Sequence, residues 1–285
     1  MKPRRLDPMG KRSARQLVRM ALRGWGRDRS WSAIHALRLR GSPETLALAQ
    51  SLARSPNVRR RVLGLHLAAQ LRQRQRDARW DSVEYAVEAT QQLLLAGLRE
   101  THPEVLRAAI SGLGHRPHPD ALDGVLAQAA HRSAEIRFDV AVALGHYADP
   151  RAVAALLKLA RDPDDDVRDW ATFSIGTMHE VDTPAVREAL WHNLRDADRD
   201  VRGEAIVGLA ARGDPRAVDY LKGQLGADCL VYELIAAEKL ASRDLLGELQ
   251  GLLPAAGGAD VDGGWLRHLL EAIKASGGEL PPAGP

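Results

Sequence analysis

A ten-residue phrase recurs four times in the middle of this 285-residue chain. Its copies begin 31, 31 and 34 residues apart, at Val105–Gly114, Ile136–Gly145, Val167–Gly176 and Val201–Ala210. A unit this short cannot bury its own apolar side, so it is stable only when it stacks on neighbouring units. The spacing therefore predicts a repeat protein.

Each copy has the apolar pattern of one helix face. Apolar residues stand at the first, fifth and ninth places, as in Ile136, Val140 and Leu144, and a spacing of four is helical. The segments between copies open with pairs such as Asp149-Pro150, in which the acid caps a helix and Pro fits its first turn. We therefore expect each unit to be two antiparallel helices joined by tight turns.

Weaker copies extend the array in both directions. Val58 opens a similar helix 47 residues before Val105, which equals one period plus an insertion near residues 72–87. Downstream, Tyr232 keeps the 31-residue step after Val201. With further helices at both ends, we predict an all-α fold of about eight antiparallel helix pairs, in which no strand pattern competes.

The same reading predicts one elongated domain with four parts. These are basic N-terminal capping helices (1–42), the repeat array with its insertion (43–241), C-terminal capping helices (242–276) and a disordered tail (277–285).

The repeat phrase resembles the HEAT-like repeats first named in phycobilisome lyases. The shared features are the short period, the D-P opening of the first helix and V-R-x-x-A-x-x-x-L-G on the second, over roughly residues 43–240. The resemblance implies a right-handed α-solenoid whose second helices line a concave wall. The family includes adaptors, bilin lyases, an iron-dependent hydroxylase and base-excising glycosylases, so fold alone leaves the function open.

The resemblance also allows the hydroxylase chemistry to be checked. In hydroxylase-like members, His-Glu pairs at the third and fourth places of the phrase ligate two irons. Here those places hold Arg107-Ala108, Phe138-Asp139, Asp169-Trp170 and Gly203-Glu204. The one His-Glu dipeptide, His179-Glu180, is expected in a loop after a helix. We therefore predict no metal, no cofactor and no catalytic residues.

The fourth place of the phrase holds the candidate binding residues. Asp139, Trp170 and Glu204 are expected in a row across three units, beside small residues at the eighth place. With Phe138 and Asp169, they predict a concave groove for a peptide, a basic side chain or a flipped base. In the alternative interpretation, Trp170 fills a seam between stacked helices and the acids are simply solvated.

A recurring arginine occupies the second place of the phrase. Arg137, Arg168 and Arg202 are expected to form ion pairs with turn aspartates in the ranges 164–166 and 196–200, since a guanidinium satisfies carboxylates and carbonyls together. We interpret these arginines as structural.

Charge is distributed unevenly along the chain. Residues 1–80 carry 20 Lys or Arg and four acids, whereas residues 81–285 carry 20 and 33. Arg12, Arg15, Arg19 and Arg23 share one helix face. Such a surface attracts nucleic acid, an anionic membrane or an acidic protein. It is alternatively a solvated basic cap, or it meets the acidic flank of a second copy.

These patterns favour a non-enzymatic protein-binding scaffold. The alternatives are a nucleic-acid-associated protein that uses the basic end, and a lyase- or glycosylase-type enzyme with its site in the groove. The single cysteine, Cys229, excludes an internal disulfide, and no apolar stretch reaches the length of a membrane span. We therefore expect the chain in the cytoplasm.

Overall fold

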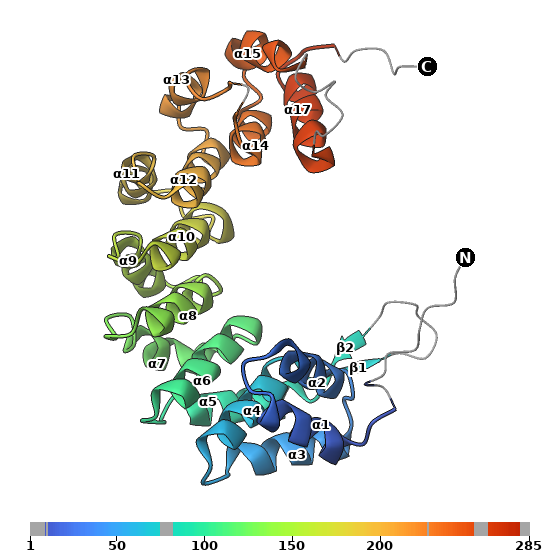
Figure 1. Cartoon of the computed structure of the whole chain (residues 1–285). Helices are drawn as coiled ribbons and strands as arrows, with labels where there is room; N and C mark the ends of the chain where they lie inside the picture. The colour runs from blue at the N-terminus through green and yellow to red at the C-terminus, as the bar shows by residue number, and fades with distance from the viewer. Residues whose placement is uncertain (1–8, 10, 75–81, 227, 254–261, 280–285) are drawn as a thin grey trace, which may run out of the picture. The chain divides into compact units, whose positions relative to one another are not determined.

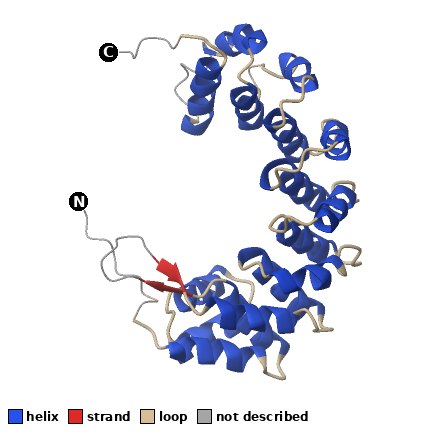
Figure 2. Cartoon of the chain, turned by 180° about the vertical axis from the view of Figure 1, so that it is seen from behind, coloured by secondary structure: helices blue, strands red, loops and turns tan. Residues whose placement is uncertain are grey.

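The computed structural model describes residues 9, 11–74, 82–226, 228–253 and 262–279. Its contacts divide the chain into two compact units, residues 1–147 and 148–285. Within the described residues the regular elements are helices, apart from one pair of short strands, which is drawn in red in Figure 2. The predicted all-α fold is confirmed. No helix in the described ranges has the length and apolar character needed to cross a membrane.

The first unit contains four helix pairs, which run from blue to green in Figure 1. Its helices are α1 (Ala14–Arg23), α2 (Asp28–Arg38), α3 (Pro43–Ala53), α4 (Val58–Ala69), α5 (Val87–Gly97), α6 (Pro103–His115), the 3-10 helix η1 (Pro119–Ala121), α7 (Leu122–Leu126) and α8 (Ala134–Leu144). Each helix packs on its partner in the pair, and the second helices α2, α4, α6 and α8 also stack on one another.

Caps set the helix starts that the sequence predicted. The Ser13 hydroxyl accepts from the Gln16 N–H, and the Gln16 side chain accepts in return from the Ser13 N–H. Ser42 caps α3, whose first residue is Pro43. These bonds satisfy amide groups that have no partner within the helix. The apolar faces then meet in a core that includes Leu17, Leu37 and Leu63.

The insertion after α4 forms a small sheet. Strands β1 (Arg72–Arg74) and β2 (Ser82–Glu84) pair antiparallel, with Gln73 opposite Val83; residues 75–81 lie outside the described part. The expectation that no strand occurs was wrong here. Three-residue, mainly polar strands have too little alternation of apolar and polar residues to show the two-residue period.

The second unit contains the other four pairs. Its helices are α9 (Pro150–Leu159), α10 (Asp165–Phe173), the π-helix η2 (Ser174–Met178), α11 (Pro184–Asn193), α12 (Arg199–Ala211), α13 (Arg216–Lys222), α14 (Val231–Leu240), the 3-10 helix η3 (Arg243–Leu245), α15 (Leu246–Gly251) and α17 (Gly263–Ala275). The second helices α10, α12, α14 and α17 stack in sequence. The prediction of about eight pairs is therefore confirmed for the described residues. Of the predicted tail, residues 280–285 lie outside them.

The small residues of the repeat phrase serve helix packing. Gly112, Ala143, Ser174 and Gly208 are all buried, and a Cβ added to Gly208 would lie 2.7 Å from the Cα of Gly176. The backbones of η2 and α12 therefore touch, which only a residue without a side chain permits. The groove expected beside these residues stays a prediction.

Candidate functional site

Three carboxyl groups on α10 and α12 of the second unit interact through their charges. We call Asp169, Asp200 and Glu204 the acidic cluster. Burial, together with the charges of Asp169 and Asp200, raises the pKa of Glu204 to about 7. Burial and the neighbouring aspartates, Asp200 first, raise the pKa of Asp169 to about 6. The cluster is thus a place where like charges meet while partly withdrawn from water.

Helix stacking brings a tyrosine from α14 to this cluster. A Cβ on Gly203 would overlap the ring of Tyr232, so that ring lies directly on the α12 backbone. A hydrogen bond with Tyr232 lowers the pKa of Glu204, against the larger effect of burial. Asp169 Oδ1 is buried and has no hydrogen-bond partner among the described protein atoms. The cluster therefore keeps an unused acceptor.

Trp170 lies next to the acidic cluster on α10. It is half-buried, and its ring meets that of Phe173 edge to face, with centroids 5.4 Å apart. Part of its surface therefore packs against its own helix, and the seam between stacked helices stays an alternative prediction. The rest of the Trp170 side chain is accessible to a partner, and its role in binding stays a prediction.

Asp139 has a different environment. It lies on α8 of the first unit, is only 6% exposed, and accepts a 2.9 Å hydrogen bond at Oδ2 from Nε of Arg107 on α6. Phe138 beside it is half-buried. Asp139 is thus a buried ion-pair partner. Because Trp170 and Glu204 belong to the other unit, the row across three units stays a prediction.

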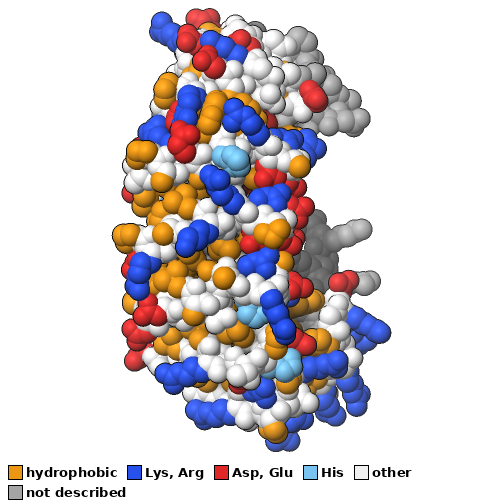
Figure 3. All heavy atoms as spheres, turned by 90° about the vertical axis from the view of Figure 1, so that its left-hand side faces the viewer, with side chains coloured by type: hydrophobic (Ala, Val, Ile, Leu, Met, Phe, Trp, Pro, Cys, Tyr) orange, Lys and Arg blue, Asp and Glu red, His pale blue; other side chains and the backbone are white. Residues whose placement is uncertain are grey.

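The basic residues of the first helix surround a shallow groove. Arg12, Arg19 and Arg23 line a hollow of about 250 Å³ with Gln16 and Met20, and Arg15 is exposed on the same helix. In Figure 3, Lys and Arg side chains gather at the lower edge of the view, over the first helices. These arginines lie close enough to share one polyanion, but that role stays a prediction.

A pocket in the first unit was not predicted. Its volume is about 410 Å³, and its lining includes Trp25, Trp31, His66, Glu104, Arg107 and Asp139. Asp139 was predicted as a groove residue, without these neighbours. Trp31 is the residue that could have indicated this pocket from the sequence, because a large apolar side chain beside polar residues on a helix is often part of a binding surface. We call this site the aromatic pocket.

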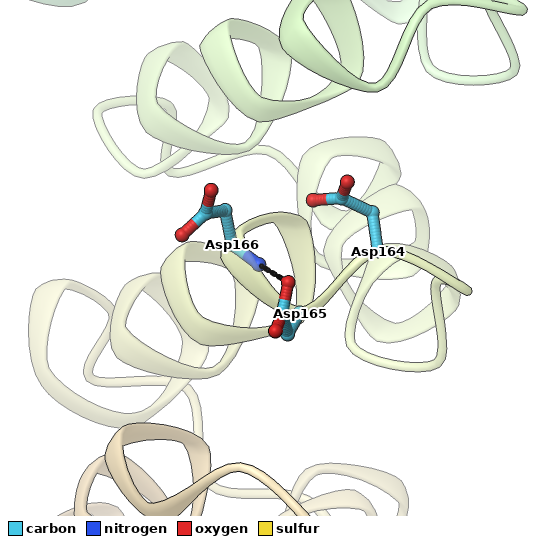
Figure 4. Close-up of side chains that lie close together, drawn as sticks. All are labelled: Asp164, Asp165 and Asp166. Atoms are coloured by element: carbon cyan, nitrogen blue, oxygen red, sulfur yellow. Dashed lines mark hydrogen bonds between the residues drawn. The ribbon is translucent and has the colours of Figure 1, made fainter.

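Three consecutive aspartates form the start of α10. Carboxylate oxygens of Asp164, Asp165 and Asp166 lie within 4.8 Å of one another (Figure 4). Asp164 caps the helix by accepting from the Val167 N–H at 3.2 Å, and Asp165 accepts from the Asp166 N–H. Acids in a first turn also complement the helix dipole. Helix capping therefore accounts for this group, and we assign it no metal.

The His-Glu dipeptide lies where the sequence placed it. His179 follows η2 directly, is 7% exposed, and its N–H donates to the Ser174 carbonyl. It stands outside the helix face that carries the acidic cluster.

Comparison with known proteins identifies relatives of the chain. A family model described as HEAT repeats matches residues 92–176 and 164–241. Protein YibA of Escherichia coli strain K12 is 32% identical over 123 residues, or 43% of this chain. That match spans 44% of the length of YibA.

Solved structures show the same architecture. The X-ray structure of E. coli YibA matches with a TM-score of 0.68 at 22% identity, over 96% of this chain and 99% of that one. The condensin Cnd3–Cnd2 subcomplex of S. pombe matches with a TM-score of 0.53 at 15% identity, over 90% and 43%. Kap95p, in its structure with RanGDP, matches with a TM-score of 0.50 at 14% identity, over 92% and 41%. Similarity at these identities establishes the fold and nothing finer.

Proposed function

Because this chain belongs to the HEAT repeat family, whose members commonly mediate protein–protein interactions, we propose that it is a non-enzymatic scaffold that binds a basic segment of a partner protein. The binding face is formed by α10, α12 and α14 of the second unit.

The acidic cluster supports this proposal most directly. Burial raises the pKa values of Asp169 and Glu204, and the charges of neighbouring carboxylates raise them further. A Lys or Arg side chain placed among them favours their charged forms and offers a donor to Asp169 Oδ1. A basic partner thus satisfies charges that the folded chain leaves uncompensated.

The neighbouring surface suits a peptide. Trp170 and Phe173 supply aromatic area on α10, the helix that carries Asp169, and aromatic residues contribute much of the binding energy at protein interfaces. The net charge has the right sign as well, since residues 148–285 carry 15 Lys or Arg and 24 acids. Complementary charge speeds association with a basic partner.

Capture of partners with matched variants tests the proposal. Immobilised protein is incubated with nuclease-treated lysate of the source organism, and bound proteins are identified by mass spectrometry. We expect Asp169→Asn with Glu204→Gln to lose a captured protein that Glu271→Gln, an exposed acid on α17, retains. A partner held equally by the cluster variant contradicts the proposal.

A second candidate function is association with a polyanion through α1. The groove lined by Arg12, Arg19 and Arg23 favours it, because several adjacent guanidinium groups release counterions from one nucleic acid. We expect Arg12, Arg15, Arg19 and Arg23 together changed to Glu to abolish binding of a labelled DNA duplex, while the acidic-cluster variant keeps it. Salt-independent binding, or binding that survives the fourfold change, excludes this function.

A further inference from the structure

The aromatic pocket belongs to the first unit, whereas the residues of the proposed function belong to the second. It is built from the second helices of successive pairs, α2, α4, α6 and α8, and from the turn before α2. These helices stack through α2·α4, α4·α6 and α6·α8 contacts. The pocket is therefore a feature of the repeat stack, and its lining comes from residues that do not repeat.

One wall of the pocket is aromatic. The ring centroid of His66 lies 6.4 Å from that of Trp25 and 5.4 Å from that of Trp31, so the two indoles flank the imidazole. Trp31 is 49% exposed, an unusual state for so large an apolar side chain. Indole faces attract flat cations because their π-electron clouds are negative. This wall is suited to a cationic group.

The charged residues of the lining carry more negative than positive charge. They are the carboxylates of Glu104 and Asp139 and the single guanidinium of Arg107. Burial raises the pKa of Asp139, whereas the hydrogen bonds and charge of Arg107 and the hydrogen bond of Ser111 lower it. Glu104 is exposed and forms no ion pair among the described residues. A second cation would therefore find two carboxylates to contact.

His66 adds no positive charge to the pocket. Burial, followed by the charges of Arg38, Arg107 and His115, lowers its pKa to about 4. The imidazole is therefore neutral near pH 7 and acts as part of the aromatic wall.

We propose that the aromatic pocket binds the guanidinium group of an arginine side chain from a protein partner, stacked on Trp31 and hydrogen-bonded to Glu104 and Asp139. Arginine suits the aromatic wall and the carboxylates, because its planar group stacks on aromatic rings and its fork of donors matches carboxylates. The volume of about 410 Å³ accommodates a side chain rather than a whole domain. An anion is disfavoured by the two carboxylates.

Two small probes that differ in charge test the proposal on the full chain. N-acetyl-arginine amide and N-acetyl-citrulline amide have nearly the same shape, but only the first is cationic. NMR spectra of the ¹⁵N-labelled protein report on the indole N–H signals of Trp25 and Trp31, assigned with Trp25→Phe and Trp31→Phe. We expect the arginine probe to shift both signals and the citrulline probe to bind about tenfold more weakly, as expected for loss of charge-assisted hydrogen bonds.

Variants locate the probe within the pocket. Trp31→Ala and Glu104→Gln remove exposed groups and are each expected to weaken binding about fivefold. Glu88→Gln, an exposed acid on α5, is expected to leave the shifts of the Trp25 and Trp31 signals unchanged. Because these signals report on the first unit, and partner capture tests the acidic cluster of the second unit, failure of this proposal and failure of the proposed scaffold function are distinguishable.

Three results would overturn the proposal. They are no shift of either indole signal with the arginine probe, equal binding of citrulline, and an equal response to inorganic phosphate, which would assign the pocket to anions.

Discussion

The guanidinium of Arg168 on α10 holds the carboxylate of Asp196, in the turn before α12, by two hydrogen bonds. The distances are 2.7 Å from Nε to Oδ2 and 2.9 Å from Nη2 to Oδ1. Arg168 Nη1 also donates to the Asp162 carbonyl of its own turn. Arg202 makes the same kind of carbonyl contact in the next unit, where its Nη1 donates to the Asp196 carbonyl. The predicted ion pair with a turn aspartate is therefore confirmed for Arg168, whereas the contacts of Arg202 are with the turn carbonyls of Asp196 and Ala197.

Arg168→Lys is expected to lower the free energy of unfolding by about 1–2 kcal/mol. An ammonium cannot form the two parallel bonds to Asp196, and both side chains are mostly buried, at 17% and 12% exposure. Urea denaturation followed by circular dichroism measures the change. Arg161→Lys, at an exposed position, serves as the control. Equal urea midpoints for Arg168→Lys and Arg161→Lys would show that the two parallel hydrogen bonds to Asp196 do not contribute to stability.

Gly208→Ala is expected to destabilise the second unit by about 1–3 kcal/mol, even though Ala is the better helix former. The added methyl would lie 2.7 Å from Gly176 Cα, so the backbones of η2 and α12 must separate. Gly247→Ala on α15 meets no atom within 4 Å and is expected to be neutral or slightly stabilising. Thermal unfolding of the pair measures the difference, and a stabilised Gly208 variant would contradict the close approach.

Glu204→Gln is expected to stabilise the chain at pH 8 and to have little effect at pH 4. Because the folded pKa of Glu204 is raised from 4.5 to about 7, the folded state binds its proton more tightly. The stabilising contribution of the neutral carboxyl is present below about pH 4.5 and is lost as the pH rises through about 7. After allowance for solvent screening, the gain at pH 8 is about 1 kcal/mol.

Denaturation of both proteins across this pH range measures the effect of Glu204→Gln. Asp169, with its pKa raised to about 6, contributes in the same direction, while Asp200 and Tyr232 face the same group. If the free energy of unfolding changed with pH in the same way in the wild-type protein and in Glu204→Gln, mutual repulsion in the acidic cluster would be ruled out.

Arg212→Met is expected to cost about 2–4 kcal/mol of stability. The Arg212 guanidinium donates to five carbonyls at the ends of η2 and α12 and in the following turn, those of Ile175, Gly176, His179, Val181 and Gly208. Methionine fills similar space but leaves these acceptors without a donor. Arg199→Met, at an exposed place on α12, is the matched control. Similar losses of stability in Arg212→Met and Arg199→Met would mean that water donates to these carbonyls as well as the Arg212 guanidinium does.

The repeat architecture and the helix starts could be predicted because their causes are local. A four-residue apolar spacing, an Asp or Ser cap and a Pro in the first turn act within one helix, and the arginine contacts recur with each unit. The strands at residues 72–74 and 82–84 escaped prediction because three residues show no period, and their support is remote. Arg116, for instance, donates to the Leu71 carbonyl 45 residues earlier in the chain.

Local sequence thus determined the helices, their pairing and their order of stacking in this protein. The tertiary structure alone decided which non-repeating side chains meet on the stacked second helices. Trp25 and Asp139 are 114 residues apart in the sequence yet line one pocket, and the charge of Asp169 raises the pKa of Glu204 on a separate helix. The physical reason is that such meetings depend on how closely and at what rotation successive helix pairs pack, and that geometry is set by side chains from several units at once.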